Sequence, residues 1–304
     1  MQTMQMSFLP TPEITFNCYH DESGTYAPNA PNGGDQWLFH GVLLVPQTRQ
    51  TELITELRAI RQKANYFDEL HYQNLRKTAG PIATCIKGWL RSYLIFSQYC
   101  YYHCLAINTH SPKFDHSRFS EPYHCYNYYA RTAIVGAIAW SLSGYHTHIV
   151  NLRFFSDLKR RSPGDNFTSY IPSEVQQTIQ KKKQAKPAKY PTLSTAKEVC
   201  LVTSNPGEVD ESLKDECELI QLTDLLTSNI AQAIKSSSDQ KGKIDLALLI
   251  SEWIDDTRKP PWLQTNELHR RFSISCFPDK YGNFYDAALL IKDKMQPMLF
   301  SDLT

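Results

Sequence analysis

Four acidic residues stand where regular elements are expected to begin or end, and their carboxylates could take part in chemistry. They are Asp21 in FNCYHDESG, Glu69 in DELH, Asp157 at the end of NLRFFSD and Asp224 in IQLTDLL. Each also has an ordinary explanation as a turn residue, a salt-bridge partner or a solvent-facing helix acid. A carboxylate in a half-buried strand or an apolar helix is costly unless it is paired or binds a metal. Together the four favour a site for Mg²⁺ or Mn²⁺, hard cations that prefer oxygen ligands.

Neighbours of these acids are candidates for supporting roles. His71 lies two residues after Glu69, so both side chains point to one side if the segment is extended. A histidine near neutral pKa could shuttle a proton, although a purely structural histidine is equally compatible with the sequence. Glu22 follows Asp21 and should point to the opposite face, in a supporting or structural role. Asp165 competes with Asp157 as the third acid.

A basic segment follows the third acid. Eight Lys and Arg residues lie between positions 159 and 189 against only two acids, in a chain whose formal net charge is +1. Its ordinary interpretation is a solvated loop, and its functional interpretation is an electropositive arm for a phosphate backbone. The predicted nucleic-acid contacts are Lys159, Arg160, Arg161, Lys181, Lys182 and Lys183.

A cysteine and histidine cluster raises the alternative of zinc. Cys100, His103 and Cys104 are followed by Cys125, and a helix would put the first three on one side. The tyrosines around them favour a strand instead, in which His103 faces away from Cys104. No CxxC pair occurs, so reduced and mostly buried thiols are expected.

The spacing of apolar residues predicts the elements that must position the acids. An alternating pattern with a Pro, Asn and Gly loop predicts an antiparallel hairpin at the start of the chain. Helices and strands then alternate, which favours a three-layer α/β domain with a mixed sheet and helices on both faces. The predicted strands are 14–22, 36–45, 98–108, 147–156 and 198–203, and the predicted helices are 49–64, 80–97, 121–142 and 216–235.

Length and composition bound the remaining possibilities. With 304 residues and 41% hydrophobic residues, the chain can bury a large core. We expect a main domain over 1–240, a basic insertion at about 158–192, and a helical extension over 241–304 packed on the same domain. No signal peptide or long apolar run is recognisable, so we expect a cytoplasmic protein without a membrane partner.

The order of DESG, ELH, a strand ending in Asp157 and IQLTDLL resembles the bacterial and archaeal domain-of-unknown-function family 3800. The resemblance covers roughly residues 14–235 and rests on short motifs. It implies a ribonuclease H-like fold with acids on the first strand, after the early hairpin, on the fourth strand and on a late helix. These positions correspond to Asp21, Glu69, Asp157 and Asp224, and the basic insertion departs from the family pattern.

Two hypotheses about function follow. The first is a metal-dependent nuclease in which the four acids hold one or two divalent ions for phosphodiester hydrolysis, with DNA or RNA as substrate. The second is a nucleic-acid-binding or protein-interaction module of the same fold without turnover, in which exposed tyrosines could stack on bases. Proteins that resemble the family suggest an accessory of a defence or mobile-element system, and therefore a protein partner.

Overall fold

The sheet of this protein has seven strands. The computed structural model describes residues 11–27, 34–159, 161–263, 268 and 271–286. The strand order is β5-β4-β1-β2-β3-β6-β7. The strands are β1 (Glu13–Ser23), β2 (Trp37–Pro46), β3 (Tyr101–Asn108), β4 (Ile149–Asp157), β5 (Thr192–Val202), β6 (Phe272–Phe277) and β7 (Tyr285–Asp286).

The first strand is central and has neighbours of both orientations. It pairs antiparallel with β2 and parallel with β4, and β4 in turn pairs parallel with β5. The predicted hairpin and the mixed sheet are therefore confirmed. Because β1 and β4 run in the same direction, their carboxyl ends meet at one edge of the sheet, where Asp21 and Asp157 lie.

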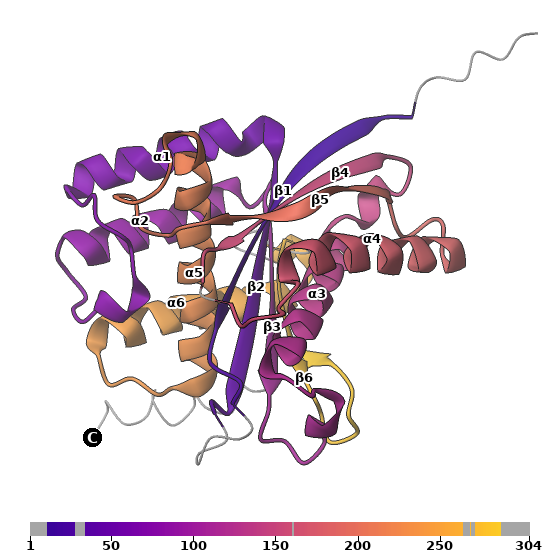
Figure 1. Cartoon of the computed structure of the whole chain (residues 1–304). Coiled ribbons are helices and arrows are strands. Elements are labelled where there is room, and N and C mark those ends of the chain that lie inside the picture. The colour runs from indigo at the N-terminus through magenta and orange to yellow at the C-terminus, as the bar shows by residue number, and fades with distance from the viewer. Residues whose placement is uncertain (1–10, 28–33, 160, 264–267, 269–270, 287–304) are drawn as a thin grey trace, which may run out of the picture.

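Helices cover both faces and complete a three-layer α/β architecture (Figure 1). One face carries α1, α2, α5 and α6, and the other carries α3 and α4. The helices are α1 (Gln47–Ala64), α2 (Pro81–Phe96), α3 (Pro122–Ser141), α4 (Phe167–Ala185), α5 (Lys214–Lys235) and α6 (Lys241–Arg258). The predicted α/β class and the helices on both faces are thus confirmed.

The basic segment differs from its expected structure. The stretch interpreted as a loop forms α4, which buries Phe167, Ile171, Val175 and Ile179 against the sheet. These residues recur every three to four positions, the spacing of one helix face. The strand that follows begins at Thr192, six residues earlier than predicted. The segment is therefore a crossover helix between two parallel strands, β4 and β5.

A glycine on the second strand lets α5 approach the sheet. A Cβ at Gly41 would lie 1.9 Å from Thr227 Oγ1 and 2.5 Å from the Tyr102 hydroxyl. Those two hydroxyl groups are hydrogen-bonded at 2.9 Å in the space that the glycine leaves. The close contact fixes the distance of α5 from β1 and β2, and α5 carries Asp224.

We expect Gly41→Ala to destabilise the fold by about 2 kcal/mol, because the added methyl group must displace two buried hydroxyl groups. Urea unfolding at pH 7.5 measures the change. Gly144→Ala is the matched control, since a Cβ there has no heavy atom within 4 Å. Equal stability of the two variants would contradict the packing role of Gly41.

Candidate active site

Acidic side chains from three elements meet at the carboxyl edge of the sheet. The register between β1 and β4 ends at His20 opposite Ser156, so Asp21 and Asp157 both follow the last pair. Helix α5 packs against β1 and brings Asp224 within hydrogen-bonding reach of Asp21. The structure thus brings together three of the four predicted acids, from β1, β4 and α5.

The ammonium group of Lys159 lies among these carboxylates. Its Nζ is 2.9 Å from Asp21 Oδ1, 2.7 Å from Glu22 Oε1 and 3.9 Å from Asp157 Oδ2. The Asp21 and Glu22 side chains are only 5% and 13% exposed, whereas Lys159 is 38% exposed. A lysine that sequence analysis assigned to nucleic acid therefore supplies the counter-charge for the acidic cluster.

The loop after α1 brings the fourth predicted acid to the same edge. Gln221 Oε1 accepts hydrogen bonds from Leu70 N at 2.8 Å and from Arg61 Nη2 at 2.7 Å. Arg61 also donates to Glu218 and to the carbonyl of Asp68. The glutamine of the IQLTDLL motif therefore holds the loop that carries Glu69 and His71.

Glu69 and His71 lie beside different members of the cluster. The Ser204 hydroxyl donates to Glu69 Oε1 at 2.7 Å and is within hydrogen-bonding reach of Asp157. His71 Nδ1 is 4.0 Å from Asp224 Oδ2, and Asp224 accepts a hydrogen bond from Ser228 at 3.0 Å. Glu69 is thus linked to the cluster through a serine, and His71 stands at its margin.

Burial disfavours ionisation of the three aspartates. It raises the pKa of Asp21, Asp224 and Asp157, and repulsion from neighbouring carboxylates adds to the rise for Asp21 and Asp157. The Lys159 ammonium opposes the rise in each pKa but does not cancel it. The shifts have one direction: each of the three aspartates is a weaker acid here than in water, and Lys159 limits the effect.

Glu22 has the opposite electrostatic environment. Burial alone would raise its pKa, but the Lys159 ammonium, with a hydrogen bond from Tyr126 of α3, lowers the pKa to about 2. Glu22 is therefore ionised, and its side chain faces α3 as predicted from its place beside Asp21. This geometry gives it the role of anchoring Lys159.

The carboxylate oxygens of the cluster are suitable ligands for a divalent cation, although the Lys159 ammonium group lies between them. Asp157 Oδ1 is buried and has no hydrogen-bond partner among the described residues. The other nearby donors are carboxylate oxygens, which suit Mg²⁺ and Mn²⁺. In the described part of the chain, no three His, Cys, Asp or Glu side chains are grouped as a metal site. The Lys159 ammonium already pairs with Asp21 and Asp157, two of the acids whose oxygens would have to converge.

The predicted basic contacts are divided between two ends of the sheet. Lys159 and Arg161 lie near the cluster, and Arg160 falls outside the described residues. Lys181, Lys182 and Lys183 lie on the last turns of α4, near the start of β5, which pairs with the start of β4. Those three lysines are thus at the end of the sheet opposite the acids.

The residues considered for zinc lie on both faces of the sheet. Residues 101–108 form a strand as expected, with Cys104 packed on the α5 side. His103 faces α3, and its Nδ1 is 2.8 Å from Ser273 Oγ. Cys125 lies on α3 and Cys100 in the core on the α5 side. The sheet itself separates the four residues.

Sequence reasoning missed two elements of the site. Ser204 follows β5 and reaches the cluster only because that strand is parallel to β4. Lys159 was recognised as basic, but its role as counter-charge was not. Its position two residues after Asp157 was the available signal, since residues i and i+2 of an extended segment point to the same side.

A search of protein-family models, of curated proteins and of solved structures found no match to this chain. The fold and the site define the class of this protein: a three-layer α/β protein with an acidic cluster at the carboxyl edge of its sheet. In the part of the chain that the structure describes, no helix has the length and apolarity needed to cross a membrane.

Two buried histidines next to the cluster predict a dependence of stability on pH. Burial lowers the pKa of His20 to about 3 and that of His40 to about 4. Their rings are linked by a hydrogen bond of 3.1 Å between His20 Nε2 and His40 Nδ1. In the unfolded chain both would take up a proton near pH 6.5, so their contribution to stability is lost as the pH falls from about 6.5 towards 4.

We expect His40→Gln to reduce this loss by about 1 kcal/mol per pH unit between pH 6 and 4.5, because one fewer buried group resists protonation. Urea unfolding at several pH values measures the slope. His110→Gln, at an exposed position, is the matched control and should leave the slope unchanged. An unchanged slope in His40→Gln would contradict the proposed neutral state of the pair.

Proposed function

We propose that this protein is a divalent-metal-dependent phosphodiesterase that acts on nucleic acid. The observation that carries the proposal is the convergence of carboxylates from β1, β4 and α5 at the carboxyl edge of the sheet, where Lys159 pairs with Asp21 and Asp157 and Asp224 lies within hydrogen-bonding reach of Asp21. A cluster of that charge and burial is costly to maintain, and such sites are kept where they do chemistry.

Asp21, Asp157 and Asp224 would hold the ion. Glu69 would join them if its hydrogen bond with the Ser204 hydroxyl were broken. When bound, Mg²⁺ or Mn²⁺ supplies Lewis acidity for attack on a phosphodiester. The protein contributes fixed positions, because Asp21 and Asp157 stand on neighbouring strands and Asp224 on a helix packed across them. His71, 43% exposed beside Asp224, is placed to accept or donate a proton at the margin of the site.

Two further observations support this class of enzyme. The resemblance to family 3800 implies a ribonuclease H-like fold with four acids. They lie on the first strand, after the hairpin, on the fourth strand and on a late helix. Lys159 and Arg161 lie beside the cluster, paired with Asp21 and Asp165, and an ion that displaced Lys159 from Asp21 would free its ammonium group for a polyanionic substrate. DNA and RNA fit this chemistry equally, and a protein partner remains part of the proposal.

A second candidate function follows from the same lysine. Because Lys159 already neutralises the cluster, the chain could serve as a nucleic-acid-binding or protein-interaction module in which the acids are structural. The two functions differ in what a divalent ion does. An enzyme exchanges the contacts of Lys159 for those of the ion, whereas a module keeps the lysine in place.

We expect Asp21→Asn and Asp224→Asn each to reduce metal-dependent cleavage of DNA or RNA by at least about 100-fold, since each removes an ion ligand. Fluorescent single- and double-stranded oligonucleotides with Mg²⁺, Mn²⁺ or EDTA provide the assay. Asp255→Asn, at an exposed position on α6, is the matched control and should retain full activity. Absence of cleavage by the wild type on every substrate would favour the binding module.

We expect Lys159→Met to bind Mn²⁺ about tenfold more tightly than the wild type, because the competing ammonium is gone. The metal-free variant should be less stable by about 2 kcal/mol at pH 7.5, and Mn²⁺ should restore the loss. Calorimetric titration and urea unfolding measure both effects. Lys197→Met, exposed on β5, should change neither. Weaker Mn²⁺ binding by Lys159→Met would contradict competition at one site.

A further inference from the structure

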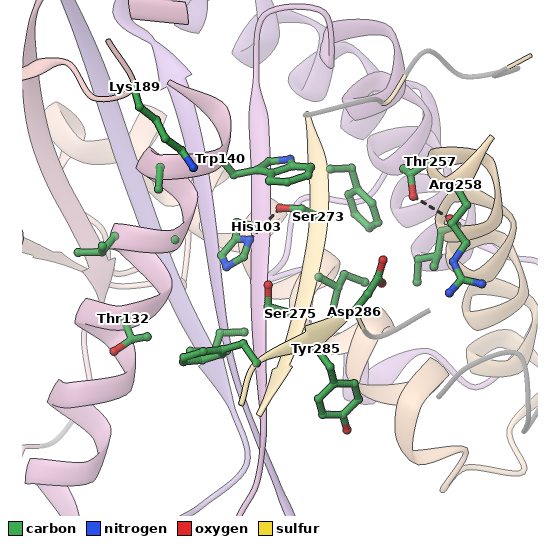
Figure 2. A pocket seen from close by; sticks show the side chains of 18 of the residues that line it. His103, Thr132, Trp140, Lys189, Thr257, Arg258, Ser273, Ser275, Tyr285 and Asp286 are labelled. Carbon is green, nitrogen blue, oxygen red and sulfur yellow. Dashed lines mark hydrogen bonds between the residues drawn. The ribbon is translucent and has the colours of Figure 1, made fainter. Parts of the chain in front are cut away.

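A cavity of about 630 Å³ lies between α3 and the edge of the sheet formed by β3 and β6, as Figure 2 shows. Its volume is typical of sites for small organic ligands. None of Asp21, Glu69, Asp157 and Asp224 borders it. Trp140, near the end of α3, lines the cavity. The start of β3 pairs with Leu44, towards the end of β2, whereas Asp21 of β1 pairs with Gly41. The cavity is thus separate from the acidic cluster.

A buried imidazole is directed into this cavity. His103 is 5% exposed, and its Nδ1 is 2.8 Å from Ser273 Oγ. Nε2 makes no hydrogen bond with a described residue and faces Gly136, where a Cβ would be only 2.8 Å away. Burial lowers the pKa of His103 to about 4, so the ring is neutral at pH 7. A ring nitrogen that has no hydrogen-bond partner among the described residues is suited to a ligand's hydrogen-bonding group.

The rim of the cavity carries three basic residues, against one acid, Asp286, that also lines it. Lys182 and Lys189 both border it, and their Nζ atoms lie 6.0 and 5.9 Å from the centre of the same Tyr190 ring. Arg258 of α6 stands on another side. None of the three forms an ion pair with a described residue. An anion bound near these cationic groups would be stabilised by them.

An aromatic surface is available beside the paired lysines. The Trp140 side chain is 48% exposed although it lines the cavity, and Tyr285 of β7 borders the other side. An exposed indole ring offers a face for stacking on a flat ring. The cavity therefore combines a stacking surface, a hydrogen-bonding histidine and serine, and a cationic rim.

We propose that this cavity binds a nucleotide, with its base near Trp140 and His103 and its phosphate between Lys182 and Lys189. A phosphate monoester carries close to two negative charges at neutral pH, which matches two unpaired ammonium groups better than a single carboxylate does. The site is independent of the proposed phosphodiesterase activity and gives the protein a place where a small nucleotide can bind without meeting the acidic cluster.

The test is calorimetric titration of the full chain in EDTA with each of the four nucleoside 5′-monophosphates, with adenosine and with inorganic phosphate. EDTA removes binding that depends on a divalent ion. We expect at least one monophosphate to bind, and adenosine and inorganic phosphate to bind about tenfold or more weakly than that nucleotide. The double variant Lys182→Gln/Lys189→Gln should weaken the nucleotide about tenfold, and Trp140→Leu should weaken it as well.

Lys181→Gln/Lys186→Gln is the matched control, because it removes two exposed lysines of the same segment that do not line the cavity. It should bind the nucleotide as the wild type does. The proposal is overturned if no monophosphate binds at about 1 mM, a concentration that detects any Kd in the low millimolar range. It is also overturned if inorganic phosphate binds as tightly as the nucleotides, or if the two double variants behave alike.

Discussion

Carboxylates at the carboxyl edge of the sheet repel one another, and a cation must lie among them for this edge to keep its arrangement. Lys159 meets that requirement through contacts of 2.9 Å with Asp21 and 2.7 Å with Glu22. The lysine is the more exposed partner, so it can leave at a smaller desolvation cost than either carboxylate would incur by losing it. The site is thus built around an internal cation that another cation can replace.

The rest of the fold maintains the geometry of this edge. Parallel pairing of β1 and β4 sets the separation of Asp21 and Asp157. The contact of α5 at Gly41 sets the distance of Asp224 from the sheet. Gln221, three residues before Asp224, holds the loop of Glu69 by a bond to Leu70 N. A single turn of α5 therefore positions both a carboxylate and the loop that brings the next one.

Local patterns in the sequence were sufficient for much of the fold. Alternating apolar residues in residues 14–22 and 36–45 predicted the hairpin, and the alternation of helices and strands predicted the mixed sheet with helices on both faces. Helix α4 was missed because the run of Lys and Arg residues from 159 to 189 was interpreted as a solvated loop or a mobile arm. The apolar spacing from Phe167 to Ile179 was the stronger signal, since a helix needs only one buried face.

Parts of the site depend on the path of the chain in three dimensions. Ser204 reaches Glu69 over 135 positions, and Lys159 contacts Asp21 over 138. Spacing along the sequence carries no information about such contacts. The assignment of Lys181, Lys182 and Lys183 to the same surface as Lys159 also relied on sequence proximity, and α4 carries those residues to the other end of the sheet.

The most direct test of this account is a crystal structure with Mn²⁺, in which anomalous scattering locates the ion. The account predicts a strong anomalous peak between Asp21, Asp157 and Asp224, with the Lys159 ammonium moved out of contact with Asp21. A map without a peak there, and with Lys159 still bound to Asp21 and Glu22 at high Mn²⁺ concentration, would contradict it. The acids would then be a structural ion-pair network.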